Sequence, residues 1–172
     1  MNNIILNVVT VVWNDIEGLE KTLNSLLRLY NSSKILFKIR VQDGDSSDGT
    51  NAFAQKFIKK HSNKNFEIIL SSESDNGIFD AMNKASSDFR NNDMVLYLNA
   101  GDVISDEIIV DDFYDSLESF AESDYKIAAY RSRNIANDIS YYMPSKKVKK
   151  NEQFYKWLIN NTPVHQALIF KY

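Results

Sequence analysis

The sequence contains no cysteine and only two prolines and five glycines among its 172 residues. Without cysteine, the chain has neither disulfides nor thiolate metal ligands, and its composition fits a reducing compartment such as the cytoplasm. No internal repeat or low-complexity linker interrupts it. We therefore expect residues 1–172 to form one domain, because this length is about that of a single hydrophobic core.

An excess of positive charge is also missing. The chain has 20 lysines and arginines against 23 aspartates and glutamates, which gives a net charge of -3. General nucleic-acid binders usually carry a basic excess, so this balance argues against a nucleic-acid partner. A nucleotide or sugar phosphate bound at one local site stays compatible with it.

No apolar run is long enough to cross a membrane. The N-terminal segment reads MNNIILNVVTVVW, and Asn7 and Thr10 interrupt its apolar character. It also lacks the basic start and small-residue cleavage site of a signal peptide, and a membrane span needs about 20 apolar residues. We interpret this segment as a buried first strand.

Strand and helix patterns alternate along the chain. Strands are predicted at residues 4–12, 36–41, 66–70, 94–98, 126–130 and 139–143. Apolar residues at helical spacing follow the first three of these strands, at 16–30, 52–58 and 78–85, and Ser105 is predicted to cap a helix with the buried face Ile109, Phe113, Leu117 and Phe120. This alternation predicts an α/β fold with a mostly parallel central sheet flanked by helices.

Polar clusters follow each of the first four strands, at residues 10–15, 43–48, 73–80 and 99–102. Because parallel strands end at one edge of a sheet, we expect these clusters to form one site there. Four separate solvated loops are the alternative, since connecting segments are usually polar.

Two aspartates in these clusters point to a particular chemistry. Asp43 directly follows the second strand, and its carboxylate suits a ring N–H donor such as uracil N3–H. Asp102 follows the fourth strand, and a single carboxylate together with substrate phosphates is a usual way to hold Mg²⁺ or Mn²⁺. The alternative for Asp102 is a solvated loop or helix N-terminal acid. The residues after Asp43 are interpreted as turn formers that satisfy their own backbone, namely Asp45, Ser46 and Asp48.

Four motifs together resemble a known family. They read VVTVVWND, VQDGDSSDGT, SSESDNGIFDAMNKA and LYLNAGD, in this order. This series resembles the family-2 glycosyltransferases of the GT-A (Rossmann-like) fold, over about residues 5 to 110, and is most similar to the bacterial polysaccharide-biosynthesis branch. The resemblance implies metal-dependent, inverting transfer of a sugar from a nucleotide diphosphate sugar, expected to be UDP-linked, to a saccharide or lipid-linked acceptor.

The resemblance also implies roles for single residues at the nucleotide. Thr10, Val12 and Asn14 would line the base, Asp43 would accept its imino proton, and Asp102 would hold the metal. Where many relatives read DADD, this chain reads NAGD. The remaining nucleotide-binding positions, Asn99 and Gly101, therefore replace acids, and the usual carboxylate contact to the ribose is missing from the sequence.

The sugar and diphosphate are expected near two further segments. By the resemblance, Asp80, Asn83 and Lys84 lie beside them, although an i, i+4 ion pair with Asp80 is the alternative for Lys84. The later segment TPVHQALIF resembles the HQ pair that this branch often places before a strand. His165 would then reach the metal or the diphosphate, with a structural role as the alternative.

The resemblance leaves the catalytic base unassigned. In relatives this base is an acid beyond the position of Tyr172, so the chain is expected to be a GT-A nucleotide-sugar-binding domain without the acceptor-side region, and to bind donor better than it turns over. A non-catalytic sugar-nucleotide-binding module or scaffold in a polysaccharide assembly complex is therefore the alternative function. A nucleotidyltransferase is less favoured, because no glycine-rich basic loop follows the first strand.

A run of lysines near residue 150 bears on where in the cell the protein is located. Its lysines are Lys146, Lys147, Lys149 and Lys150. We interpret the run as a solvated loop. The alternative is peripheral contact with anionic lipid at the inner membrane face, where each basic residue contributes about 1 kcal/mol. The sequence leaves the donor sugar, the acceptor and the oligomeric state open.

Overall fold

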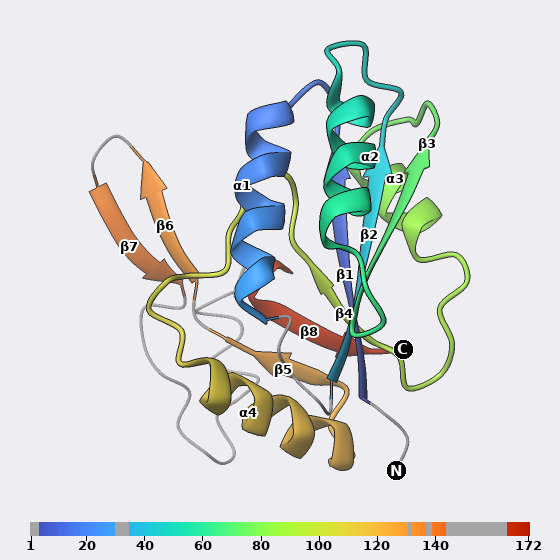
Figure 1. Ribbon diagram of the computed structural model, residues 1–172. Coiled ribbons are helices and arrows are strands. Elements are labelled where there is room, and N and C mark those ends of the chain that lie inside the picture. Colours follow the sequence, from blue (N-terminus) through green and yellow to red (C-terminus); the bar gives the residue numbers. More distant parts are fainter. Residues whose placement is uncertain (1–3, 30–34, 131, 137–138, 144–164) are drawn as a thin grey trace.

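The structure, a computed structural model, describes residues 4–29, 35–130, 132–136, 139–143 and 165–172, with only the backbone described for 134–136 and 139–143. Six strands form the central sheet in the order β3-β2-β1-β4-β8-β5, while β6 (Ser132–Ala136) and β7 (Ile139–Met143) pair separately. In Figure 1 this hairpin projects from the rest of the fold. The sequence predicted β7 but not β6. Tyr30 and the lysine run lie outside the described residues.

The first half of the sheet is parallel. The central strand β1 (Ile4–Val12) pairs in parallel with β2 (Ile35–Asp43) and with β4 (Met94–Tyr97), and β2 pairs in parallel with β3 (Phe66–Ser72). The side chains of β1 from Leu6 to Val12 are all buried, which explains its nearly unbroken apolar sequence. The predicted parallel units are confirmed here.

The other edge of the sheet is antiparallel. Strand β8 (Leu168–Lys171) runs antiparallel to β4, and β5 (Ile127–Ala129) runs antiparallel to β8. The short 3-10 helix η2 (His165–Ala167) precedes β8. Because β8 runs opposite to β4, its amino end lies beside the carboxyl end of β4. This arrangement brings His165 to the edge of the sheet that carries the polar clusters.

Helices cover both faces of the sheet (Figure 1). On one face, α1 (Ile16–Leu26), the following 3-10 helix η1 (Leu27–Leu29), α2 (Thr50–His61) and α4 (Val110–Glu122) contribute to the larger apolar core. On the other face, α3 (Ile78–Ala85) packs its alanines and Met82 on Val9, Val11 and Val95. No helix in the described part of the chain is both long and apolar enough to span a membrane.

The start of α4 differs from the prediction. The helix begins at Val110 instead of directly after Ser105, and Ile109, predicted to be buried, is 64% exposed. Arg28 accounts for the delay, because its guanidinium donates to the backbone carbonyls of Ser105 at 3.0 Å and Asp106 at 3.1 Å. These tertiary contacts hold residues 105–106 as a turn against η1.

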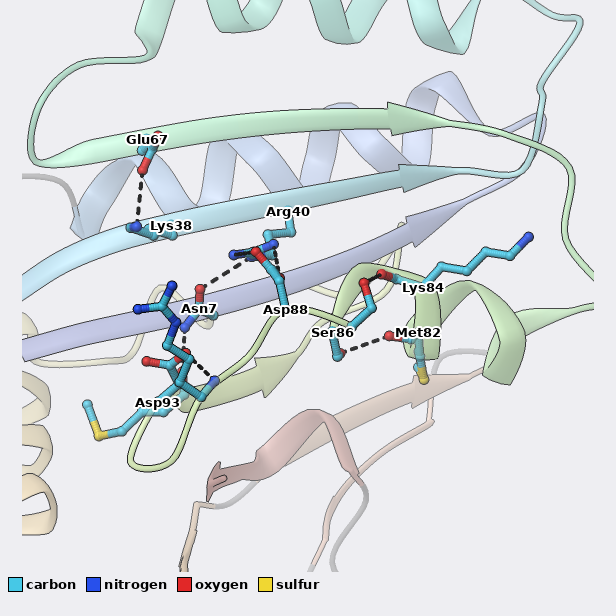
Figure 2. A network of polar contacts seen from close by, with 12 residues as sticks. Asn7, Lys38, Arg40, Glu67, Met82, Lys84, Ser86, Asp88 and Asp93 are labelled. Atoms are coloured by element: carbon cyan, nitrogen blue, oxygen red, sulfur yellow. Dashed lines mark hydrogen bonds and ion pairs between the residues drawn. The ribbon is translucent and has the colours of Figure 1, made fainter.

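A polar network fastens the C-terminal end of α3 to the sheet (Figure 2). Arg40 on β2 donates to both carboxylate oxygens of Asp88, at 2.7 and 3.1 Å, and approaches the side-chain oxygen of Asn7 at 3.4 Å. Its guanidinium carbon also lies 4.7 Å from the ring centre of Phe89. The segment after α3 is therefore tied to the middle of β2.

Candidate functional site

The carboxyl ends of the four parallel strands meet at one edge of the sheet. The backbone N–H of Gly44 donates to Val12 at 2.9 Å, and that of Ala100 donates to Val11 at 3.1 Å. The loops after β2 and β4 therefore flank the end of β1, with Asp43 on one side and the turn containing Asp102 on the other. The prediction that the polar clusters share one edge is confirmed.

A cavity of about 320 Å³ opens at this edge. Strands β2 and β4 lie on opposite sides of β1, so the order of the sheet reverses between β1 and β4. Ligands of open α/β sheets bind at such reversal points, outside the carboxyl ends of the strands. The cavity lies there: its lining comes from the end of β1, the β3–α3 loop, the first turns of α3 and the turn after β4, with the residues Val11, Val12, Trp13, Asp15, Asp75, Gly77, Ile78, Ala81, Asn99 and Ala100.

Asn14 holds two of the loops at this edge together. Its backbone N–H donates to the hydroxyl of Ser46 at 2.8 Å, and its side-chain oxygen accepts from the backbone of Ser47 at 2.8 Å. Asn14 has a φ of 50°, in the left-handed region that asparagine tolerates better than most residues. These contacts brace the β1–α1 loop against the β2–α2 loop.

Asp43 is fully buried and serves as an acceptor for two serines. Its Oδ1 accepts from the backbone and the hydroxyl of Ser46, and its Oδ2 accepts from the hydroxyl of Ser72 at 2.7 Å. A carboxylate oxygen has two lone pairs, so Oδ2 retains acceptor capacity. Asp43 pairs in register with Val12, which lines the cavity.

Thr10 and Val12 lie on the face of β1 that packs toward α1 and α2. Thr10 is 0% exposed, and its hydroxyl oxygen has no hydrogen-bond partner among the described residues. Of these two predicted base-lining residues, Val12 reaches the cavity wall and Thr10 does not.

The polar residues of α3 hold the β3–α3 loop. Asp80 accepts from the backbone N–H of Asn76 at 2.9 Å, and this contact is the main reason why the pKa of Asp80 is lowered. Lys84 donates to the carbonyl of Ser74 at 2.7 Å and lies 3.4 Å from Asp80, so the ion pair given as its alternative is present. Asn83 is exposed, and none of the three predicted residues of α3 lines the cavity.

The NAGD segment forms a tight turn. The N–H of Asp102 donates to the carbonyl of Asn99 at 3.0 Å, and Gly101 has a φ of 92°. A hydrogen bond from the fourth residue to the first, with a positive φ at the third, is characteristic of a type II turn, which favours glycine at the third position. Gly101 therefore shapes the backbone that presents Asp102.

Asp102 lies beside the HQ pair. Burial raises its pKa above the usual value, against the opposing effects of a hydrogen bond with Gln166, one with the backbone of Asn99, and the nearby charge of His165. The ring Nε2 of His165 lies 3.4 Å from the side-chain nitrogen of Asn99. The two ends of the turn thus each contact one residue of η2.

The donor set at this turn suits a hard divalent cation that also binds phosphate. The buried side-chain oxygen of Asn99 has no hydrogen-bond partner among the described residues, and the Asp102 carboxylate lies three residues further on. No three histidine or acidic side chains cluster in the described ranges. A cation here would be completed by phosphate oxygens and water, which is the usual arrangement for Mg²⁺.

Sequence reasoning missed three residues at this edge. Trp13 lines the cavity and is 70% exposed, and Asp75 lines it from the β3–α3 loop. Gly44 permits the approach of Asp75, since a Cβ there would lie 2.8 Å from its carboxylate. Trp13 lies in the motif VVTVVWND and Asp75 in the motif SSESDNGIFDAMNKA. Their position shortly after a strand was the signal that could have identified them as site residues. Thr22 is a third, a buried polar residue within the apolar stripe of α1.

Comparisons with known proteins agree with this arrangement. The family model described as Glycosyl transferase family 2 matches residues 7–170. The structure of TarS 1-349 from S. aureus in complex with UDP-GlcNAc is similar with a TM-score of 0.66 and 17% identity, over 96% of this chain and 45% of that chain. The mannosyltransferase PcManGT from Pyrobaculum calidifontis, in complex with GDP-Man and Mn2+, is similar with a TM-score of 0.55 and 18% identity, over 71% of this chain and 34% of that chain.

The likeness to these two structures concerns the fold. It confirms the predicted α/β architecture with a mostly parallel central sheet flanked by helices. This chain spans less than half the length of either structure. A search among curated proteins gave no significant match.

Proposed function

The chain belongs to glycosyl transferase family 2. We therefore propose that it binds a nucleotide diphosphate sugar, with UDP as the nucleotide, and that the sugar is transferred from this donor to a hydroxyl group. The acceptor is a saccharide or a lipid-linked saccharide in the synthesis of a bacterial polysaccharide. The observation that carries this proposal is the cavity at the reversal point of the sheet, which is lined by the exposed Trp13 and by Asn99 and Ala100 of the turn that leads to Asp102.

The nucleobase lies at the β1 end of the cavity in this proposal. Trp13 offers an exposed aromatic face, and stacking of a base on such a face contributes roughly 1–3 kcal/mol. Asp43 accepts the imino N–H through the remaining lone pair of Oδ2. Val12 and Asn14 shape this end of the cavity. Thr10 is buried within the sheet and supports this end without lining the cavity.

Asp75 supplies the acid that the NAGD turn lacks. It lines the cavity, and its Oδ1 accepts the backbone N–H of Gly77 at 2.8 Å, which fixes its direction. Its Oδ2 lies so close to Gly44 that a Cβ at that position would be only 2.8 Å away. We assign it to a ribose hydroxyl, since carboxylates accept hydrogen bonds from such groups. Gly101 then contributes backbone shape, as the turn requires.

The diphosphate lies at the β4 end. Asp102, with the Asn99 side-chain oxygen and His165, would hold Mg²⁺ or Mn²⁺, and the bound cation would neutralise charge on the departing diphosphate. Lys84 reaches the diphosphate by replacing its contact with the Ser74 carbonyl by a contact with a phosphate oxygen. Asp80 and Asn83 lie beside it and orient the sugar. Asp102 must be ionised for this, so its raised pKa makes donor binding sensitive to mild acid.

Titration calorimetry with UDP, in the presence and absence of Mn²⁺, tests the proposal. The unmodified chain should bind UDP, and Mn²⁺ should tighten binding. Asp102→Ala should remove the Mn²⁺ effect, and Trp13→Ala should weaken binding with or without Mn²⁺. Asp115→Ala is the matched control, since it removes an exposed acid on α4 and should change nothing.

Two results would overturn the assignment. Absence of UDP binding to the unmodified chain would remove the site, and an unchanged Mn²⁺ effect in Asp102→Ala would place the metal elsewhere. GDP is run in parallel, because equal affinity for GDP would contradict a uridine-specific site. Release of UDP from UDP-sugars in the presence of saccharide acceptors then separates a transferase from a binding module.

A further inference from the structure

One threonine hydroxyl on α1 contacts three backbone groups of the turn that carries Asp102. Thr22 is fully buried, and its Oγ1 lies 2.7 Å from the carbonyl of Asp102 and 3.2 Å from that of Asn99. It also accepts the N–H of Gly101 at 3.0 Å. These groups lie more than 70 residues away in sequence.

A hydroxyl has one proton and two lone pairs, so it can donate to one carbonyl while accepting from an N–H. The carbonyl of Asp102 is the nearest acceptor, closer than that of Gly18 in the preceding turn of α1 at 3.1 Å. Thr22 therefore donates out of its helix to the turn. With the N–H of Asp102 bonded to Asn99, both backbone groups of Asp102 are held.

Two further polar residues, Ser25 on α1 and Arg28 on η1, contact the chain that follows this turn. Ser25 accepts the N–H of Ile104 at 3.0 Å and donates to the carbonyl of Thr22 at 2.7 Å, and Arg28 holds residues 105 and 106. Polar residues spaced three apart thus follow the chain from Asn99 to Asp106. Only Thr22 contacts the turn that precedes Asp102, so it alone among these three bears directly on the direction of that carboxylate.

We propose that Thr22 is a positioning residue for the cation site: its hydroxyl fixes the NAGD turn so that Asp102 and the Asn99 side-chain oxygen face the same diphosphate. This inference rests on the proposed function. Groups that orient a metal ligand through hydrogen bonds typically change metal affinity by about 10- to 100-fold when they are removed. Binding of the nucleobase depends on other loops, so the affinity for uridine should not change when the Thr22 hydroxyl is removed.

The test compares three ligands on purified variants of the chain: UDP with Mn²⁺, UDP without metal, and uridine. Thr22→Val keeps the shape of the side chain but removes the hydroxyl. It should reduce the Mn²⁺-dependent gain in UDP affinity on the order of tenfold or more, while uridine affinity stays unchanged. Thr22→Ser should restore the gain. If Thr22→Val does not fold, Thr22→Ala takes its place with the same expected result.

Ser116→Ala is the control for loss of a helix hydroxyl. Ser116 on α4 contacts the carbonyl of Phe113 and the hydroxyl of Tyr130, so its removal should lower stability without changing the Mn²⁺ effect. If Thr22→Val lowers stability but keeps the Mn²⁺ effect, or lowers uridine and UDP affinity equally, the positioning role is wrong. Failure of the unmodified chain to bind UDP would instead contradict the proposed function, so the two failures are distinguishable.

Discussion

The carboxylate of Asp102, in the turn after β4, is half-buried, and no lysine or arginine in the described part of the chain forms an ion pair with it. The pKa of Asp102 is raised above its usual value of 3.8, because burial penalises the charged form more than Gln166, Asn99 and His165 favour it. A raised pKa means that ionised Asp102 makes the folded chain less stable than it would be with a neutral side chain there. Such a cost is typical of sites whose charge serves a ligand.

Asp102→Asn should therefore increase the free energy of unfolding at neutral pH. The charge penalty exists above the raised pKa and disappears below 3.8, where the carboxyl is protonated in both folded and unfolded chains. The advantage of the variant should accordingly shrink as the pH falls from neutral through the raised pKa of Asp102 toward 3.8. Urea denaturation across this range measures the change, with Asp115→Asn as the exposed control. A variant less stable than the unmodified chain at neutral pH would contradict this account.

Single residues also show where sequence reasoning ends. Asp43 and Asp102 were identified because each follows a strand, and a strand end predicts an edge of the sheet. Thr22 could not be assigned a role in this way, since its partners are carbonyls about 80 residues later. Its only signal was a hydroxyl within the apolar stripe of α1, and that signal names no partner.

At the scale of elements, the direction of β8 determines which residues join the site. A mostly parallel sheet was predicted, and a parallel β8 would have placed His165 at the opposite edge. The antiparallel pairing of Leu96 with Ile169 instead brings η2 beside the NAGD turn. Strand direction depends on how the preceding segment crosses the sheet, which periodicity does not report. The late start of α4 has a similar origin, because Arg28 holds residues that had been assigned to the helix.

The attachment of α3 gives a prediction at this scale. Arg40→Met should lower the free energy of unfolding by about 1–2 kcal/mol, since it removes a two-point ion pair with Asp88 and the contact with Phe89. Lys38→Met on the same face is the matched control. It loses only a 3.6 Å pair with Glu67 and should cost less than about 0.5 kcal/mol. Equal losses in the two variants, measured by urea denaturation, would show that the Arg40 network does not anchor α3.

At the scale of the whole molecule, the order of the sheet explains why distant motifs form one site. The chain passes from β1 outward to β2 and β3 and then returns to the other side of β1 with β4. The crevice between the ends of β1 and β4 is therefore bordered by loops from both halves. Alternating strands and helices were enough to predict this edge, because parallel units with right-handed crossovers allow few other arrangements. The loop contacts of Asn14, Asp75 and Lys84 depend on side-chain packing and required the structure.

The most direct test of the central claim is a crystal structure of the chain with UDP and Mn²⁺, with the metal located by its anomalous scattering. We predict one manganese peak in contact with the Asp102 carboxylate and the diphosphate, and the uracil ring against Trp13 with its N3–H directed at Asp43. A manganese peak away from the β4 turn, or a nucleotide bound outside the crevice between β1 and β4, would contradict the account.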